Sequence, residues 1–133
     1  MRWIDRVVDM SQPGSGTTET DIIEGSLMLV KGLIFTSVLI ELMAQSYGYI
    51  KALEVTDKNK FLAVASLAAI DEFEFLVDDL PKIGTVLQTK VTTLSSVRPI
   101  YVISASVFEG NKKLCTAKMK CFALFNGENW ELT

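Results

Sequence analysis

The most apolar segment of the chain reads Gly32-Leu-Ile-Phe-Thr-Ser-Val-Leu-Ile-Glu-Leu-Met-Ala-Gln-Ser-Tyr-Gly-Tyr-Ile50. It is too long for a strand, and we expect a helix from residue 33 to about residue 53. Because apolar residues cover most of its circumference, this helix should be buried on nearly all sides. Small or acidic residues recur on its remaining stripe at spacings of four, three and four: Ser37, Glu41, Ala44 and Gly48.

Glu41 is the residue of this segment that needs a chemical explanation. A lone carboxylate among apolar neighbours is costly to bury unless something pairs with it or uses it. The chain contains no histidine, so the usual proton carrier near neutral pH is missing. Both facts point to a catalytic site built around one acid, Glu41. The alternative is a structural carboxylate that is hydrogen-bonded to the backbone or to Gln45.

Strand signals occupy the rest of the chain. Apolar and polar residues alternate in most of these stretches, and Glu109-Gly110-Asn111-Lys112 is a hairpin signal. We expect two shorter strands before the helix and four long ones after it, at residues 3–8, 17–24, 61–75, 85–94, 101–107 and 114–125. A single buried helix requires the antiparallel sheet to curl around it. The sequence therefore predicts one α+β domain spanning residues 1–133.

Composition narrows the functional classes. A net charge of −3 with 22% charged residues argues against disorder and against nucleic-acid binding through bulk charge. Lys31 and Glu41 interrupt the apolar segment, whereas a membrane span needs about 20 apolar residues. The first residues contain no secretory apolar region. We therefore expect a cytoplasmic protein that does not enter the membrane.

The two cysteines, Cys115 and Cys121, lie at even spacing on one predicted strand. They share a face of that strand but cannot form a disulfide along an extended chain. We expect reduced core thiols. With no histidine and no close cysteine pair, the sequence predicts neither a metal site nor a cofactor.

Several segments resemble one enzyme family in order along nearly the whole chain. Val38-Leu-Ile-Glu-Leu-Met-Ala-Gln45, followed by Gly48, resembles the central-helix signature of the 3-hydroxyacyl-(acyl-carrier-protein) dehydratases, FabZ and FabA. Weaker likenesses to the same family lie at Ile4-Asp5-Arg6-Val7, at Leu67-Ala-Ala-Ile-Asp71 with Phe73 and Phe75, and at Pro81-Lys-Ile-Gly84. The resemblance implies the hotdog fold, an antiparallel sheet wrapped around one long central helix. It also implies a role in fatty acid or polyketide biosynthesis.

In that family the helix glutamate delivers a proton to the departing hydroxyl, and a histidine from the partner subunit removes the α-proton. Glu41 matches the glutamate. The histidine position falls at Leu27, although the nearby Gly25 remains. The resemblance implies that Gly25, Leu27, Met28 and Gln45 line the substrate site. It also implies that isolated dehydratase activity is weak.

The missing base leaves three functions open. The first is a dehydratase-like lyase acting on acyl carrier protein or coenzyme A thioesters, with Asp21 or Glu24 as a substitute base. The second is a hotdog thioesterase in which Glu41 alone activates water. The third is a non-catalytic acyl-binding subunit that pairs with an active, histidine-bearing homologue.

Association with a second subunit is expected in each case. Residues 61–70 are apolar on both faces, and an unpaired apolar edge invites aggregation. The sequence therefore predicts a homodimer or a dimer of dimers formed at this strand. An acidic carrier protein would need a basic docking patch, and the lysines between Lys112 and Lys120 are the densest cluster.

Overall fold

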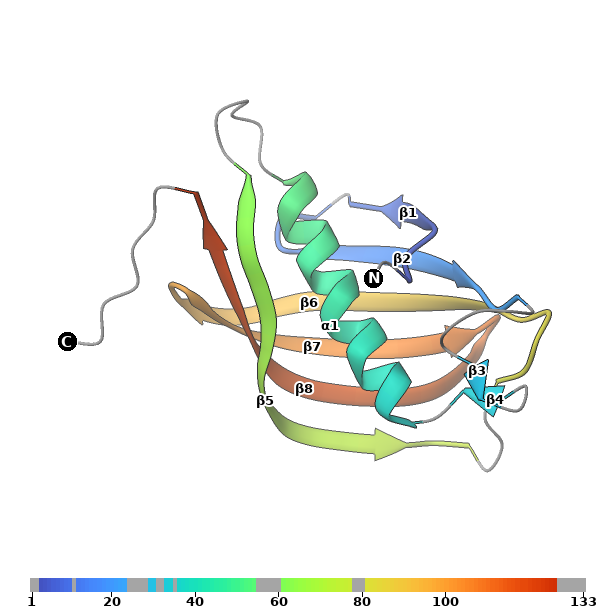
Figure 1. Cartoon of the computed structure of the whole chain (residues 1–133). Coiled ribbons are helices and arrows are strands. Elements are labelled where there is room, and N and C mark those ends of the chain that lie inside the picture. Colours follow the sequence, from blue (N-terminus) through green and yellow to red (C-terminus); the bar gives the residue numbers. More distant parts are fainter. Residues whose placement is uncertain are drawn as a thin grey trace.

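The computed structural model describes residues 3–10, 12–23, 29–30, 33–34, 36–54, 61–77 and 81–126. One helix, α1 (Thr36–Leu53), lies on one face of a six-stranded antiparallel sheet (Figure 1). The strand order is β1-β2-β6-β7-β8-β5. The strands are β1 (Arg6–Asp9), β2 (Ser15–Asp21), β5 (Leu62–Phe75), β6 (Val86–Val97), β7 (Ile100–Glu109) and β8 (Lys112–Phe125). A separate two-stranded sheet joins β3 (Leu29–Val30) to β4 (Leu33–Ile34).

The predicted α+β architecture is confirmed, with two strands of the main sheet before the helix and four long strands after it. The helix start is the main difference. Leu33 and Ile34 pair with Val30 and Leu29 in the small β3–β4 sheet, so their backbone is extended and α1 begins at Thr36. Among the described residues, α1 included, no helix combines the length and apolar character that crossing a membrane would require.

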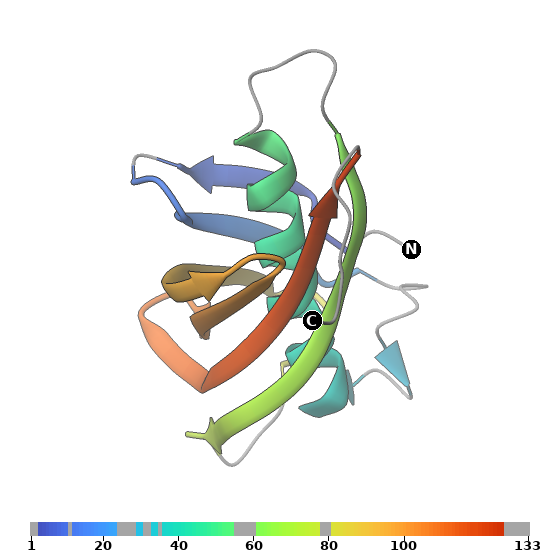
Figure 2. The same cartoon turned by 90° about the vertical axis from the view of Figure 1, so that its left-hand side faces the viewer.

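The sheet curves past the helix at β5 and β8 (Figure 2). The pairing of these two strands shifts register three times, between Leu62 and Val64, Leu67 and Ala69, and Ile70 and Glu72. Such irregularities bend a strand and increase its local twist. The three register shifts explain how β5, the last strand in the sheet order, bends to run alongside α1.

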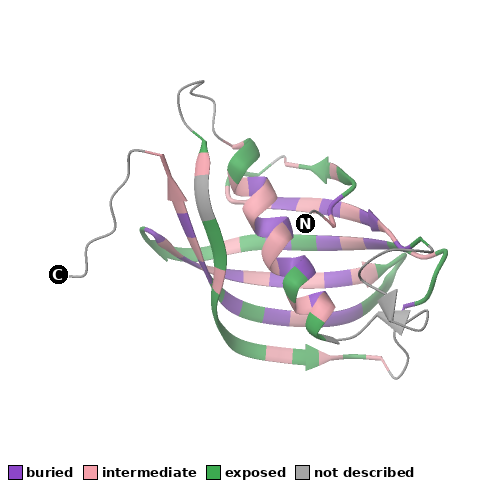
Figure 3. Cartoon of the chain, viewed as in Figure 1, coloured by how far each residue is buried: buried purple, intermediate pink, exposed green. Residues whose placement is uncertain are grey.

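The core lies between α1 and the sheet face that it covers (Figure 3). The alternation predicted for the last two strands is confirmed, because every second residue of β7 from Tyr101 to Val107 is buried. The helix contributes one buried face to this core, made of Leu39, Leu42, Met43, Tyr47 and Ile50. The expectation that α1 is buried on nearly all sides is wrong for the single chain. Its residues Ser37, Glu41 and Ala52 are exposed.

Hydrogen bonds fix α1 on the sheet. The Tyr47 hydroxyl lies 2.6 Å from the Thr93 hydroxyl, which donates to the carbonyl of Gly14 at 2.8 Å. The amide of Gly14 in turn donates to the Glu54 carboxylate at 2.7 Å. These bonds connect the end of the helix to the loop before β2 and to β6. These hydrogen bonds therefore help to fix the position of the helix on the sheet. They also fix the side of the helix that stays exposed, which carries Ser37, Glu41 and Ala52.

The close approach of β2 to α1 generates a stability prediction. A Cβ atom at Gly16 would meet Ile50 Cγ1 at 2.8 Å and the carbonyl oxygen of Asp9 at 3.0 Å. Because Ile50 is fully buried and Asp9 presents backbone, Gly16→Ala should lower the free energy of unfolding by about 1–3 kcal/mol. Urea denaturation followed by circular dichroism measures this change.

Gly48→Ala is the matched control. A Cβ atom at Gly48 would lie 3.5 Å from the Cβ atom of Ala65, an ordinary contact. Alanine also favours the helix over glycine, so this variant should gain up to about 1 kcal/mol of stability. Equal stabilities for Gly16→Ala and the unmodified protein would contradict the packing of β2 under α1.

Candidate active site

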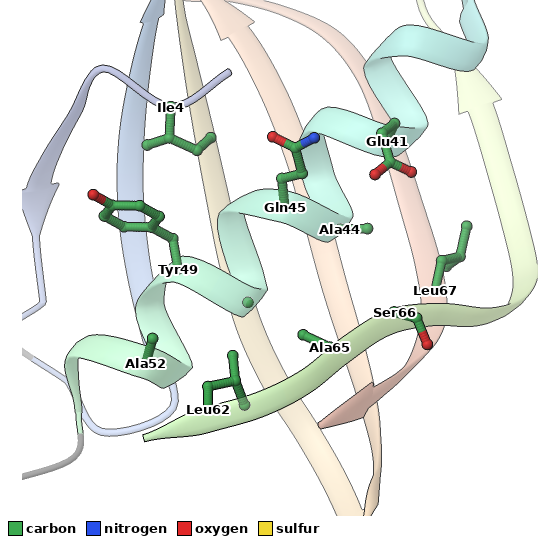
Figure 4. A pocket seen from close by; sticks show the side chains of 11 residues that line it. Ile4, Glu41, Ala44, Gln45, Tyr49, Ala52, Leu62, Ala65, Ser66 and Leu67 are labelled. Atoms are coloured by element: carbon green, nitrogen blue, oxygen red, sulfur yellow. The ribbon is translucent and has the colours of Figure 1, made fainter. Parts of the chain in front are cut away.

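A groove of about 460 Å³ runs between α1 and β5 (Figure 4). One wall is the exposed stripe of the helix, and the other is the strand that ends the sheet order. The N-terminal segment closes one side through Ile4. The lining residues are Ile4, Glu41, Ala44, Gln45, Gly48, Tyr49, Ala52, Leu62, Ala65, Ser66 and Leu67. The volume lies in the range of small-molecule sites.

The helical period explains why these residues meet. Residues three and four positions apart share one face of a helix, so Glu41, Ala44, Gln45, Gly48 and Ala52 form a continuous stripe. The opposite face is fixed by the core. The small side chains on the stripe leave room between the helix and β5, and this room is the groove.

Glu41 is the charged residue of the lining. It lies near the N-terminal end of α1, and its side chain points into the groove (Figure 4). The expectation that this carboxylate is buried is wrong for the single chain, because Glu41 is exposed. The helix presents it on the side that the sheet does not cover. The carboxylate is therefore available to a ligand in the groove.

Gln45 lies one helical turn after Glu41 and is held by the N-terminal segment. Its Oε1 atom accepts a hydrogen bond of 3.0 Å from the backbone amide of Trp3. This bond leaves the Nε2 group, which lies on the side of Glu41 (Figure 4), as a donor. The structure brings Gln45 and Glu41 together in the lining of one groove.

Asp21, one of the two candidate substitute bases, is engaged elsewhere. Both of its carboxylate oxygens accept hydrogen bonds from Arg6, at 2.9 and 2.6 Å. The hydrogen bonds from Arg6 lower the pKa of Asp21, and a carboxylate with a lowered pKa is a weaker base. Asp21 is also absent from the groove lining. The other candidate, Glu24, lies outside the described residues, as do Gly25, Leu27 and Met28.

The predicted lysine cluster divides into two parts. Lys118 pairs with Glu72 in the β5–β8 register, and Lys120 Nζ lies 3.8 Å from a carboxylate oxygen of Asp71. Asp71 therefore offsets part of the charge of Lys120, and Glu72 lies opposite Lys118 on the neighbouring strand. At the start of β8, Lys113 lies over the Phe108 ring, with its Nζ atom 5.6 Å from the ring centre. A carrier-docking role for this end stays a prediction.

The β5 wall of the groove was not expected from the sequence. Leu62, Ala65 and Leu67 point from β5 toward the helix, but residues 61–70 were interpreted only as a subunit edge. The run of small residues in this strand is a signal that could have indicated a close approach to the small-residue stripe of α1. Among the described residues, no group of three histidine, cysteine, aspartate or glutamate side chains could hold a metal ion.

Comparisons with known proteins identify the fold and family. A family model described as ApeP-like, ApeP dehydratase, matches residues 1–129. No significant sequence match is found among curated proteins. Among solved structures, the dehydratase heterocomplex ApeI:P from Xenorhabdus doucetiae has a TM-score of 0.75 and 16% identity, covering 92% of this chain and 83% of that chain.

Thioesterase structures are also similar to this chain. A hypothetical thioesterase from Streptococcus pneumoniae with coenzyme A has a TM-score of 0.62 and 17% identity, over 90% of this chain and 84% of that chain. The protein smu.793 from Streptococcus mutans, bound to acetyl coenzyme A, has a TM-score of 0.60 and 17% identity, over 90% and 87%. These likenesses show that the six-stranded sheet and its helix form a hotdog fold.

The two cysteines generate a pKa-based prediction. Both are buried free thiols on β8, as expected. Burial raises the pKa of Cys115 to about 11 and that of Cys121 to about 12, and the charge of Glu41 adds to the second shift. Because the thiolate is the reactive form, neither thiol should react with Ellman's reagent at pH 8 in the native protein. Both should react in denaturant. Rapid native labelling would contradict the placement of these residues.

Proposed function

This chain belongs to the ApeP-like dehydratase family, and from that premise we propose that it is one half of a two-subunit, FabZ-like dehydratase for 3-hydroxyacyl thioesters in the cytoplasm. The supporting observation is the position of Glu41, an exposed carboxylate in a groove beside β5, the strand that ends the sheet order in the described part of the chain. This chain supplies the acid of the reaction. A histidine-bearing hotdog subunit supplies the base.

The elimination requires both groups. The base removes the proton from C2 of the acyl chain, and the electron pair of that bond becomes the C2–C3 double bond. The C3–O bond breaks, and the hydroxyl leaves as water after taking a proton from the Glu41 carboxyl. This chain has no histidine, and Asp21 is paired with Arg6, so the proposal takes the base from another subunit.

Gln45 complements Glu41 in this proposal. As the C2 proton departs, negative charge develops on the thioester carbonyl oxygen, and a fixed hydrogen-bond donor stabilises it. The Nε2 group of Gln45 is such a donor, since the bond from Trp3 to Oε1 orients the amide. Gln45 would therefore bind the carbonyl while Glu41 acts at C3.

The free edge of β5 is the proposed attachment site for the second subunit. β5 pairs with β8 on one side, and it ends the sheet order, so its other edge has no strand partner among the described residues. Its exposed residues include the apolar Ala65, Ala69 and Ile70. Pairing here would satisfy the backbone groups of β5 and bring a second subunit to the groove. The relative from Xenorhabdus doucetiae forms a heterocomplex of this enzyme class.

The homodimer or dimer of dimers expected from the sequence stays a prediction for the isolated chain. So do Gly25, Leu27 and Met28 as substrate-binding residues. Either acyl carrier protein or coenzyme A could present the thioester. Two other functions, a thioesterase that uses Glu41 and a non-catalytic acyl-binding subunit, give different results in the experiment that follows.

Glu41→Gln tests the acid in the assembled enzyme. We expect this chain, purified with a histidine-bearing hotdog homologue from its own source, to dehydrate 3-hydroxyacyl thioesters. Glu41→Gln should lower kcat by about two to four orders of magnitude, because glutamine cannot donate the proton. Glu109→Gln is the matched control, since Glu109 is an exposed carboxylate at the end of β7, outside the groove and away from β5, and its kcat should be unchanged.

Three results would change the assignment. Full activity in the Glu41→Gln complex would remove Glu41 from the reaction. Thiol release by the isolated chain, lost in Glu41→Gln, would identify a thioesterase instead. Thioester binding without either reaction, in the chain alone and in the complex, would identify a non-catalytic acyl-binding subunit.

Leu27→His tests the missing base. The family resemblance places the histidine at Leu27, so this variant should gain measurable dehydratase activity as an isolated protein while the unmodified chain has little. A spectrophotometric assay of the enoyl thioester measures the gain. Leu27→Phe is the control, because it changes the side chain without adding a base. Robust dehydration by the unmodified isolated chain would contradict the need for a second subunit.

A further inference from the structure

A short N-terminal segment, residues 3–5, lies beside β2 and reaches the groove, and we call it the N-terminal strap. Its last residue is fastened to β2. The Asp5 amide donates to the Glu19 carbonyl at 3.0 Å, and the Asp21 amide donates to the Asp5 carboxylate at 2.7 Å. Ile4 is only 2% exposed, because it packs into the core while it also lines the groove. The strap therefore has a fixed course toward α1.

The contact between the strap and Gln45 has one possible polarity. A backbone N–H group can only donate, so the Gln45 atom that lies 3.0 Å from the Trp3 amide nitrogen has to be the acceptor, Oε1. The other half of the side-chain amide, Nε2, lies toward Glu41 (Figure 4). A glutamine without such a contact could present either atom to the groove. The strap therefore decides that Gln45 presents a hydrogen-bond donor beside Glu41.

We propose that the N-terminal strap is a positioning element for Gln45, with the backbone amide of Trp3 as its positioning group. The proposal rests on the function proposed above, in which Nε2 of Gln45 stabilises the charge that develops on the thioester carbonyl oxygen. A donor that is already oriented stabilises this charge without reorganisation during the reaction. A glutamine side chain that nothing holds has to lose its rotational freedom at that moment, and this loss raises the barrier.

Trp3→Pro tests the positioning group, because proline has no backbone N–H. Trp3→Ala is the matched control, since it removes the same indole ring and keeps the amide. In the complex with the histidine-bearing homologue, we expect kcat of Trp3→Pro to lie about tenfold below that of Trp3→Ala, because one glutamine side chain then has to be ordered in each turnover. KM should differ by less than about twofold, since the held amide acts mainly in the transition state. In a Gln45→Met background the two Trp3 variants should have equal kcat, because no amide remains to be held.

Asp5→Ala tests the strap as a unit and leaves the Trp3 amide in place. This variant removes the carboxylate that accepts from the Asp21 amide, so the strap loosens and kcat should fall by about two- to tenfold. Asp5→Asn keeps an acceptor oxygen at the same place and should restore kcat. Because Asp5 is exposed, neither change disturbs the core, and this pair tests the proposal even if Trp3→Pro does not fold.

Hydrogen exchange of the Trp3 amide, followed by NMR, gives a readout that needs no activity. We expect exchange to be slowed by at least about tenfold in the unmodified protein and to become fast in Gln45→Met. Fast exchange in the unmodified protein would overturn the proposal. Equal kcat for Trp3→Pro and Trp3→Ala in an active complex would also overturn it, and would leave Gln45 as an anchor for the strap only. A slowly exchanging Trp3 amide in a complex that dehydrates no 3-hydroxyacyl thioester would instead overturn the proposed function, and the positioning role with it.

Discussion

The site depends on the packing of one face of α1 against the sheet. Leu39, Leu42, Met43 and Ile50 are removed from water between the helix and the strands, and this burial fixes the rotation of the helix about its axis. Because the rotation is fixed, the residues on the opposite side of the helix cannot turn into the core. Glu41 and its stripe of small neighbours therefore face β5 and solvent.

The groove requires both the small residues on the exposed stripe of α1 and the position of β5 opposite them. A stripe of small residues beside an ordinary strand of the sheet would be filled by bulky side chains. Here the opposing strand presents Ala65, and its irregular pairing with β8 bends it along the helix. The edge of β5 that faces away from β8 has no strand partner among the described residues. β5 therefore forms a wall of the groove and, in the proposed function, also the attachment surface, so a subunit that pairs with β5 would come to lie beside Glu41.

Hydrophobic periodicity predicted the fold well but the site only in part. Alternation in residues 101–107 and 114–125 indicated strands because neighbouring side chains point to opposite faces, and the structure confirms both. The same reasoning failed for the helix. The periodicity of apolar residues shows which positions share a face of the helix. It does not show whether that face packs into the core of the chain or lines an open groove. Glu41 was therefore expected to be buried, and the β5 wall was not recognised.

Local signals also failed where a tertiary contact decides the outcome. Leu33 and Ile34 continue the apolar run of the helix, but they pair with β3, and pairing keeps their backbone extended. Asp21 looked like a candidate base because of its place in the sequence. Only the fold brings Arg6 to both of its carboxylate oxygens and lowers its pKa. Long-range contacts of this kind are absent from any window of sequence.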